Sequence, residues 1–175
     1  PNGQMTLWIT SDQASSGTLT MTNGTFNTTF NVAANGIVAI NIPHALAHIS
    51  NAESGLVIQK SIKVLVDPGQ QAVVAYAQQY GNARSAATLL LPKNVLGKKY
   101  FAVSFNQINT TGGGQTAMSQ FQIIATNPNT NVTITPRFNG VLQTPFTIAL
   151  PNIGDMYQYQ ASQDITGSLV ESIAG

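Results

Sequence analysis

Two histidines, His44 and His48, stand four residues apart in the segment PHALAHIS, a spacing that would place two imidazoles on one face of a helix. Zinc proteases combine this spacing with a glutamate that directly follows the first histidine and acts as the general base. Here that position is Ala45, and no sustained helical periodicity surrounds the motif. We therefore expect two ordinary loop histidines and no metal site.

Carboxylates are the second group that could do chemistry, because a glycosidase needs two of them across one cleft. In this sequence they are scattered singly in turns: Asp12, Glu53, Asp67, Asp155, Asp164 and Glu171. No G-x-S-x-G elbow is present, and neither histidine has a serine and an aspartate in a known triad order. The glycine-rich stretch 110–116 lacks the lysine of a phosphate-binding loop. We expect a protein that is not an enzyme and that has no cofactor.

The chain carries very little charge. Its 7 Lys and Arg and 6 Asp and Glu among 175 residues give a net charge of +1, and charged residues make up 7% of the sequence, against about 25% in an ordinary domain. Such a balance does not predict binding to nucleic acid. No apolar run approaches the ~18 residues that a membrane-spanning helix needs. The absence of cysteine excludes thiol catalysis and cysteine-based zinc sites.

The stretch TLTMTNGTFNTTFNV, residues 18–32, alternates apolar with polar side chains on both sides of Asn23-Gly24. Since side chains of a strand point to opposite faces in turn, this pattern predicts two half-buried strands joined by an Asn-Gly hairpin. The apolar members of the second strand are expected to face a core: Phe26, Phe30 and Val32. Its polar members are expected to face solvent: Asn27, Thr29 and Asn31.

Short runs of this kind recur along the whole chain, about five residues long and about ten residues apart, with turn residues between them. They predict an all-β fold of tandem antiparallel β-sandwich modules, and the alternative is a set of propeller-like meander blades. The expected strands are 5–10, 17–22, 26–32, 36–42, 55–62, 63–67, 71–79, 87–92, 99–105, 120–126, 131–136, 146–150, 156–161 and 168–173.

The two ends of the chain resemble each other. The order of elements from TLWIT to LVIQKSI returns as QIIAT to SLVESI, offset by roughly 115 residues, which indicates a diverged internal repeat. We expect a first β module over 1–112 and a second, incomplete one over 113–175. After LVIQKSI the first copy continues into QAVVAYAQQ, whereas the second copy stops. We expect a strand from a continuing polypeptide or a neighbouring molecule to fill this place beside 168–173, because an unpaired sheet edge rarely stays open.

Aromatic residues offer a platform for sugar stacking, although most stand at strand positions where we expect a core: Trp8, Tyr76, Tyr80, Tyr100, Phe101, Tyr157 and Tyr159. Tyr157 and Tyr159 alternate with glutamines on one strand, and we take their side of it as the candidate face for a glycan or a partner. Four Asn-x-Ser/Thr triplets permit N-glycosylation in a secreted protein: Asn23, Asn27, Asn109 and Asn131. In a chain so rich in Asn and Thr, about three such triplets arise by chance.

The segment QQAVVAYAQQYGNARSAATLLLPKNVLGKKYFAVSF, followed by SQFQIIATNPNTNVTITP and DITGSLVESIAG, resembles the N-terminal domain of the IgG-Fc-binding mucus proteins. The shared order is an ATLLLP strand, a VLG-x-x-Y turn into FAVSF, then Q-F-x-I-x-A-T and V-T-I-T-P. The resemblance runs from about Leu56 to the end of the chain. DPGQQ stands where the family usually has a charged turn.

This resemblance implies a secreted or cell-surface module without enzymatic activity, acting in adhesion, mucus or extracellular matrix. The open edge expected beside 168–173 predicts partners that are other protein chains or further copies of this chain, bound through open β edges. A carbohydrate-binding module is the alternative. The family has no agreed motif for its binding residues, so the resemblance carries neither a site residue nor IgG binding over to this chain.

Overall fold

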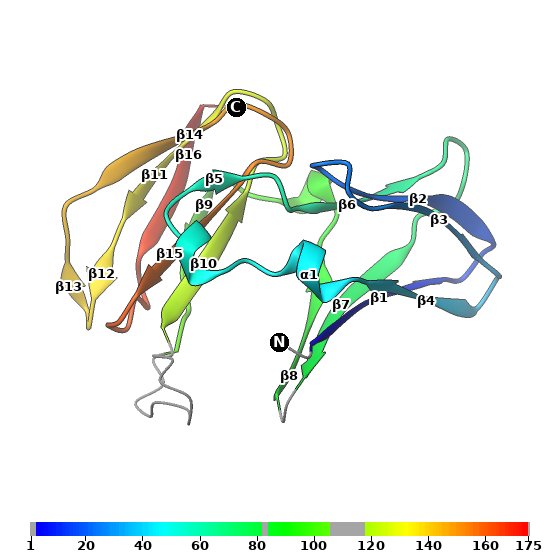
Figure 1. Ribbon diagram of the computed structural model, residues 1–175. Helices are drawn as coiled ribbons and strands as arrows, with labels where there is room; N and C mark the ends of the chain where they lie inside the picture. The colour runs from blue at the N-terminus through cyan, green and yellow to red at the C-terminus, as the bar shows by residue number, and fades with distance from the viewer. Residues whose placement is uncertain (1–2, 82–83, 106–117, 175) are drawn as a thin grey trace. The chain divides into compact units, whose positions relative to one another are not determined.

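The computed structural model describes residues 3–81, 84–105 and 118–174 (Figure 1). Nearly all of its regular structure is β-strand, arranged in several small antiparallel sheets. The predicted all-β fold class is confirmed.

The chain forms two compact units, and it passes between them more than once. Unit 1 consists of Pro1–Ile49 and Gln59–Leu96, and unit 2 consists of Ser50–Ile58 and Gly97–Gly175. This division differs from the single boundary expected after residue 112. A short segment from the first half of the sequence belongs to unit 2, which periodicity along the chain does not reveal.

Unit 1 is a β-sandwich of two antiparallel sheets. The larger sheet has the strand order β4-β1-β7-β8, and the smaller one has the order β3-β2-β6. The strands are β1 (Gln4–Ser11), β2 (Ser15–Met21), β3 (Asn27–Val32), β4 (Gly36–Ile42), β6 (Ile62–Val66), β7 (Val74–Gly81) and β8 (Arg84–Leu90). Two single-turn helices join them: α1 (His44–Ala47) and η2 (Lys93–Val95).

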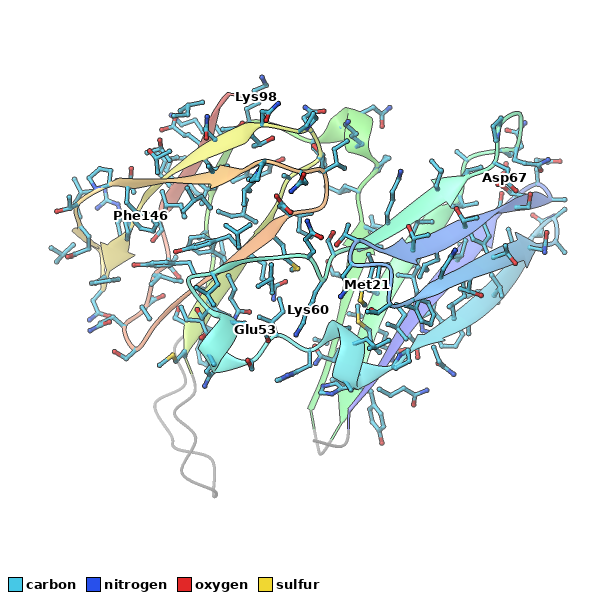
Figure 2. All side chains as sticks on the ribbon, turned by 45° about the horizontal axis from the view of Figure 1, so that its top comes forward. Met21, Glu53, Lys60, Asp67, Lys98 and Phe146 are labelled. Carbon is cyan, nitrogen blue, oxygen red and sulfur yellow. The ribbon has the colours of Figure 1, made fainter. Side chains whose placement is uncertain are left out.

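The core of unit 1 is built from alternate side chains of strands in both sheets. Leu7 and Ile9 come from β1, Leu19 and Met21 from β2, and Phe30 from β3, and none of these five is more than 2% exposed. Met21 is labelled among the side chains of this unit in Figure 2. Burial of this size is the main favourable term for folding.

The β2–β3 hairpin agrees with the sequence prediction. The two strands pair antiparallel, and their turn passes through Gly24 at a φ of +74°, a conformation that costs glycine least. Among the expected core residues, Phe30 and Val32 are buried and Phe26 packs against the core. The expected solvent residues are all exposed: Asn27, Thr29 and Asn31. The predicted register is confirmed.

Unit 2 contains the sheets β14-β11-β16-β9 and β10-β15-β5, together with the hairpin β12-β13. The first sheet is formed by β9 (Lys99–Phe101), β11 (Thr130–Thr135), β14 (Phe146–Leu150) and β16 (Leu169–Ala174). The second sheet is formed by β5 (Val57–Ile58), β10 (Ser119–Ile124) and β15 (Met156–Ala161). The remaining elements are η1 (Asn51–Glu53), β12 (Arg137–Phe138) and β13 (Val141–Leu142).

The core of unit 2 centres on Ile134 and Leu150, which are both 0% exposed. Three aromatic rings pack against it. The ring centroid of Tyr159 lies 5.4 Å from that of Phe121 and 5.8 Å from that of Phe146. Phe146 is labelled in Figure 2. These distances are within the range in which aromatic pairs attract each other.

The strand pairing of the two units corresponds as the internal repeat predicts. The β1–β4 pair of unit 1 recurs as β10–β15, the β2–β3 pair as β11–β14, and the β2–β6 pair as β11–β16. Unit 2 adds β5 beside β15 and β9 beside β16. Unit 1 adds β7 beside β1, and among the described strands nothing takes this place beside β10.

The expected open edge at 168–173 is wrong. The strand β16 pairs with β11 on one side and with β9 on the other. Lys99 and Glu171, which face each other across β9 and β16, also form a salt bridge of 2.8 Å. The expectation failed because β7 pairs with β1 and not with β6. Among the described residues of unit 2, the place without a counterpart of β7 is therefore the one beside β10.

Phe30→Ala is expected to lower the free energy of unfolding by about 3–5 kcal/mol, because removal of a buried ring leaves a cavity. Trp8 is the single tryptophan of the chain and lies in unit 1, so its fluorescence in a urea titration reports the unfolding of this unit. The control is the neighbouring exposed residue, since Asn31→Ala should change the free energy by less than about 0.5 kcal/mol. Equal losses in the two variants would contradict the register.

Candidate functional site

The outward side of the four-stranded sheet of unit 1 carries an aromatic and aliphatic surface, which we call the outer face. Leu7 and Ile9 of β1 point into the core, so the alternating Trp8 points outward. Across the sheet, Trp8 stands opposite Ala39 of β4 and Tyr76 of β7, and Tyr76 stands opposite Leu89 of β8. The residues of the outer face are Gln4, Thr6, Trp8, Thr10, Ile37, Ala39, Asn41, Val74, Tyr76, Gln78, Tyr80, Ser85, Ala87 and Leu89.

The large side chains of the outer face are open to solvent. Ile37, Val74, Tyr76, Tyr80 and Leu89 are between 43% and 64% exposed. They come from β4, β7 and β8, which are hydrogen-bonded to β1 or to each other in one sheet. Scattered exposed apolar residues need no explanation, whereas a gathering of them on one side of a sheet is a feature of surfaces through which proteins bind other molecules.

The outer face has no charged residue, and several of its polar groups bond to each other. The indole Nε1 of Trp8 donates to Oε1 of Gln78 at 2.8 Å. Oδ1 of Asn41 accepts from Oγ1 of Thr6 at 2.9 Å and from Nε2 of Gln4 at 3.1 Å. Since these groups keep their partners when water leaves, covering the face costs less than burying unpaired polar atoms would.

The expectation that the aromatic residues fill a core is wrong for several of them. Tyr76, Tyr80, Tyr100 and Phe101 are all exposed. In β7 the two residues that pack against the core are alanines, Ala75, which is buried, and Ala77. The alternation of small and aromatic residues in VAYAQQY carried the signal, because small side chains fit a tightly packed interior and leave the tyrosines outside.

Tyr157 and Tyr159, the expected glycan or partner face, lie against the core of unit 2. Tyr157 is 7% exposed and Tyr159 is half-buried. Burial raises the pKa of the Tyr157 hydroxyl, and burial together with the neighbouring Tyr157 raises the pKa of Tyr159. The face that we expected to be open is therefore turned inward. Alternation identified the face but did not show which side of the strand is covered.

His44 is the first residue of the one-turn helix α1, and His48 directly follows its last residue. Their ring centroids are 5.0 Å apart and their ring planes are tilted by 32°. Among residues 3–81, 84–105 and 118–174, no three His, Cys, Asp or Glu residues come together in an arrangement that would hold a metal ion. The glycine-rich stretch 110–116 lies outside the described residues.

Carboxylates that are isolated in the sequence accept hydrogen bonds in turns or pair with a residue on a neighbouring strand. Asp67, labelled in Figure 2, accepts a hydrogen bond of 2.6 Å from Oγ of Ser16. Glu53, in the same figure, accepts from the backbone N–H of Ser50 at 2.9 Å in a capping box. Asp155 is 1% exposed. Bonds of this local kind stabilise turns and helix starts.

The candidate glycosylation sites lie in different settings. Asn23 is exposed in the turn between β2 and β3, Asn27 is exposed at the start of β3, and Asn131 is half-buried in β11. Asn109 lies outside the described residues. Their modification stays a prediction.

The paired sheets define two all-β units, and unit 1 is a β-sandwich that carries the outer face. The model of the family named IgGFc binding protein matches residues 86–174, which is just over half of the 175-residue chain. The chain belongs to this family. The match begins in β8 and includes every strand from β9 to β16.

The searches of curated proteins and of solved structures found no match. None of the helices in the described part of the chain has the length and apolar character needed to cross a membrane.

Asp164 is expected to titrate below its ordinary pKa of 3.8, because its Oδ1 accepts hydrogen bonds from the backbone N–H and the hydroxyl of Thr166. A lowered folded-state pKa means that this stabilisation is present above pH 3.8 and is lost as the pH falls through the folded value. The measurement is an NMR titration of the Asp164 carboxyl carbon. Thr166→Val keeps the backbone donor and removes the hydroxyl, so the midpoint should rise partway towards 3.8. Equal midpoints in both proteins would contradict the assignment.

Proposed function

We propose that this chain is a module, without enzymatic activity, that binds other protein chains in adhesive, matrix-type or mucus-type assemblies outside the cell. The observation that carries the proposal is the outer face, on which Trp8, Tyr76, Tyr80 and Leu89 gather without a single charge. Membership of the IgGFc binding protein family agrees with binding to protein, although the family name does not identify the partner of this chain.

The chemistry of the outer face suits a protein partner. Tyrosine and tryptophan contribute a large contact area for a small loss of side-chain freedom, and they are enriched where proteins bind each other. A face without charge gains nothing from electrostatic steering and loses nothing to ionic screening. Binding at this surface should therefore vary little with salt concentration.

An extracellular setting is part of the proposal. It is supported by the family, whose domains typically occur in secreted proteins. The exposed acceptor positions Asn23 and Asn27 are accessible to glycosylation, which is compatible with passage through a secretory pathway. Glycans at these two positions are expected only if the chain passes through a secretory pathway.

Carbohydrate binding at the same outer face is the second candidate. The observation in its favour is the row of Trp8 and Tyr76 on neighbouring strands, with Tyr80 further along β7 on the same side. Aromatic rings on a sheet present flat apolar surfaces with polar tips, which suits stacking on sugar rings. The two candidates share residues and differ in what they bind.

Tyr80→Lys is expected to weaken binding about tenfold or more, because it places an unpaired charge in a contact that excludes water. The measurement is surface plasmon resonance with immobilised native mucin, enzymatically deglycosylated mucin and the Fc fragment of IgG as separate probes. Thr29→Lys is the matched control, because it places the same charge at an exposed strand position of unit 1, on β3 in the other sheet.

The pattern across probes distinguishes the candidates. Binding that survives deglycosylation, falls with Tyr80→Lys and changes little with salt supports a protein partner. Binding that disappears on deglycosylation and returns on a glycan array supports the carbohydrate candidate. Binding that Tyr80→Lys and Thr29→Lys affect equally would contradict a role for the outer face.

A further inference from the structure

The strand β10 of unit 2 has one neighbour where its counterpart β1 has two. In unit 1, β1 lies between β4 and β7 and pairs with both along its length. In unit 2, β10 pairs with β15, the counterpart of β4, and no other strand of the described residues pairs with it. Among the described residues, one edge of β10 therefore has no counterpart of the strand that covers β1 in unit 1.

The register shows which backbone groups of β10 point towards this edge. The N–H of Ala125 donates to the carbonyl of Asp155 at 2.9 Å, and the N–H of Gly154 donates to the carbonyl of Ala125 at 2.8 Å. The backbone N–H and C=O groups of Ala125 thus point towards β15. Because backbone groups of successive strand residues point to opposite sides, the N–H and C=O groups of Gln122 and Ile124 point away from β15.

The hydroxyl of Ser104 supports this assignment independently. It accepts a hydrogen bond of 3.0 Å from the N–H of Gln120 and donates one of 3.3 Å to the carbonyl of Gln120. Gln120, Gln122 and Ile124 are alternate residues of β10, so their backbone N–H and C=O groups point to the same side. Ser104 contacts those of Gln120, so this side is the one opposite β15. Ser104 occupies the start of the edge and leaves the backbone groups of Gln122 and Ile124 beyond it.

Side chains of β10 are more exposed than their counterparts in β1, which β7 covers. Alignment of TLWIT with QIIAT makes Thr6 and Leu7 the counterparts of Gln122 and Ile123. Thr6 and Leu7 are 8% and 1% exposed, whereas Gln122 is exposed and Ile123 is half-buried. The edge of the second core is thus uncovered at the place where β7 covers the first one.

We propose that the free edge of β10 binds an extended segment of another protein, which adds beside it as an antiparallel strand of the β7 type. In β7 the two residues that pack against the core are small, with Ala75 buried and Ala77 partly buried. A segment with small residues inward and Gln or Tyr outward therefore fits beside β10 as β7 fits beside β1.

The edge is suited to this mode of binding. In strand addition, main-chain hydrogen bonds supply the affinity and alternate side chains supply the specificity. The strand SQFQII has no lysine, glutamate or proline, the residues with which proteins usually prevent pairing at an exposed edge. The site belongs to unit 2 and shares no residue with the outer face of unit 1, so either proposal can fail without the other.

The test uses the full chain and a fluorescent peptide of residues 72–81, AVVAYAQQYG, with a scrambled peptide of the same composition as the control. Fluorescence anisotropy should show binding of the β7 peptide and not of the scrambled one. Gln122→Pro removes a backbone N–H that faces away from β15, a position where a sheet edge tolerates proline, and it should weaken binding at least about tenfold.

Gln122→Ala is the matched control. It removes the same side chain, including its 3.0 Å hydrogen bond from Nε2 to Oε1 of Gln158, and keeps the backbone N–H. Its peptide affinity should stay within about threefold of the parent chain, because the ladder bonds are unchanged. Equal weakening by Gln122→Pro and Gln122→Ala would overturn a main-chain binding mode.

Amide hydrogen exchange keeps the proposal testable if the proline variant does not fold. On peptide binding the amides of Gln122 and Ile124 should become protected, while those of Phe121 and Ile123, which face β15, are protected throughout. Protection of Gln122 and Ile124 before any peptide is added would overturn the proposal. A dimer of the chain that Gln122→Pro dissociates, without peptide binding, would replace the β7-type segment with a second copy as the occupant.

Discussion

The pairing of β1 with both β4 and β7 is the contact on which unit 1 depends. It places Leu7 and Ile9 at the centre of a four-stranded sheet, where they are 1% and 0% exposed. The same pairing brings Trp8 level with Tyr76, and so creates the outer face. One strand therefore serves the core with one side and the exposed surface with the other, as the period of two in a strand requires.

The scarcity of charge connects the fold to its surface chemistry. Only 7% of the residues are charged, so threonine, asparagine and glutamine supply much of the polar surface and bond across strands, as Thr133 does with Thr147. Such a surface keeps its hydrogen bonds when it is covered. It also lacks the charges that normally keep sheet edges apart, which makes association through faces and edges physically accessible.

Local patterns predicted what depends on neighbours in the sequence. The alternation of residues 18–32 and the glycine at the turn were sufficient for the β2–β3 hairpin, because both strand faces and the turn conformation are local properties. Partners distant in the sequence were not predictable in this way. In unit 1 the strand β7 pairs with β1, whereas in unit 2 no strand of the described residues takes the matching place beside β10. The three-residue strand β9 instead closes the edge of β16 that we expected to be open. The exposure of Tyr80 and the burial of Tyr157 likewise depend on which elements cover each face, and alternation does not contain this information.

The two copies of the repeat differ in one strand, because β7 covers β1 and no strand of the described residues covers the same edge of β10. Amide hydrogen exchange of the chain alone tests it most directly, because both strands are measured in one sample under the same conditions. We expect the amides of Thr6 and Trp8 to exchange slowly, since β1 is paired on both sides. Those of Gln122 and Ile124 should exchange at nearly unprotected rates. Equal protection of the two pairs of amides would contradict it.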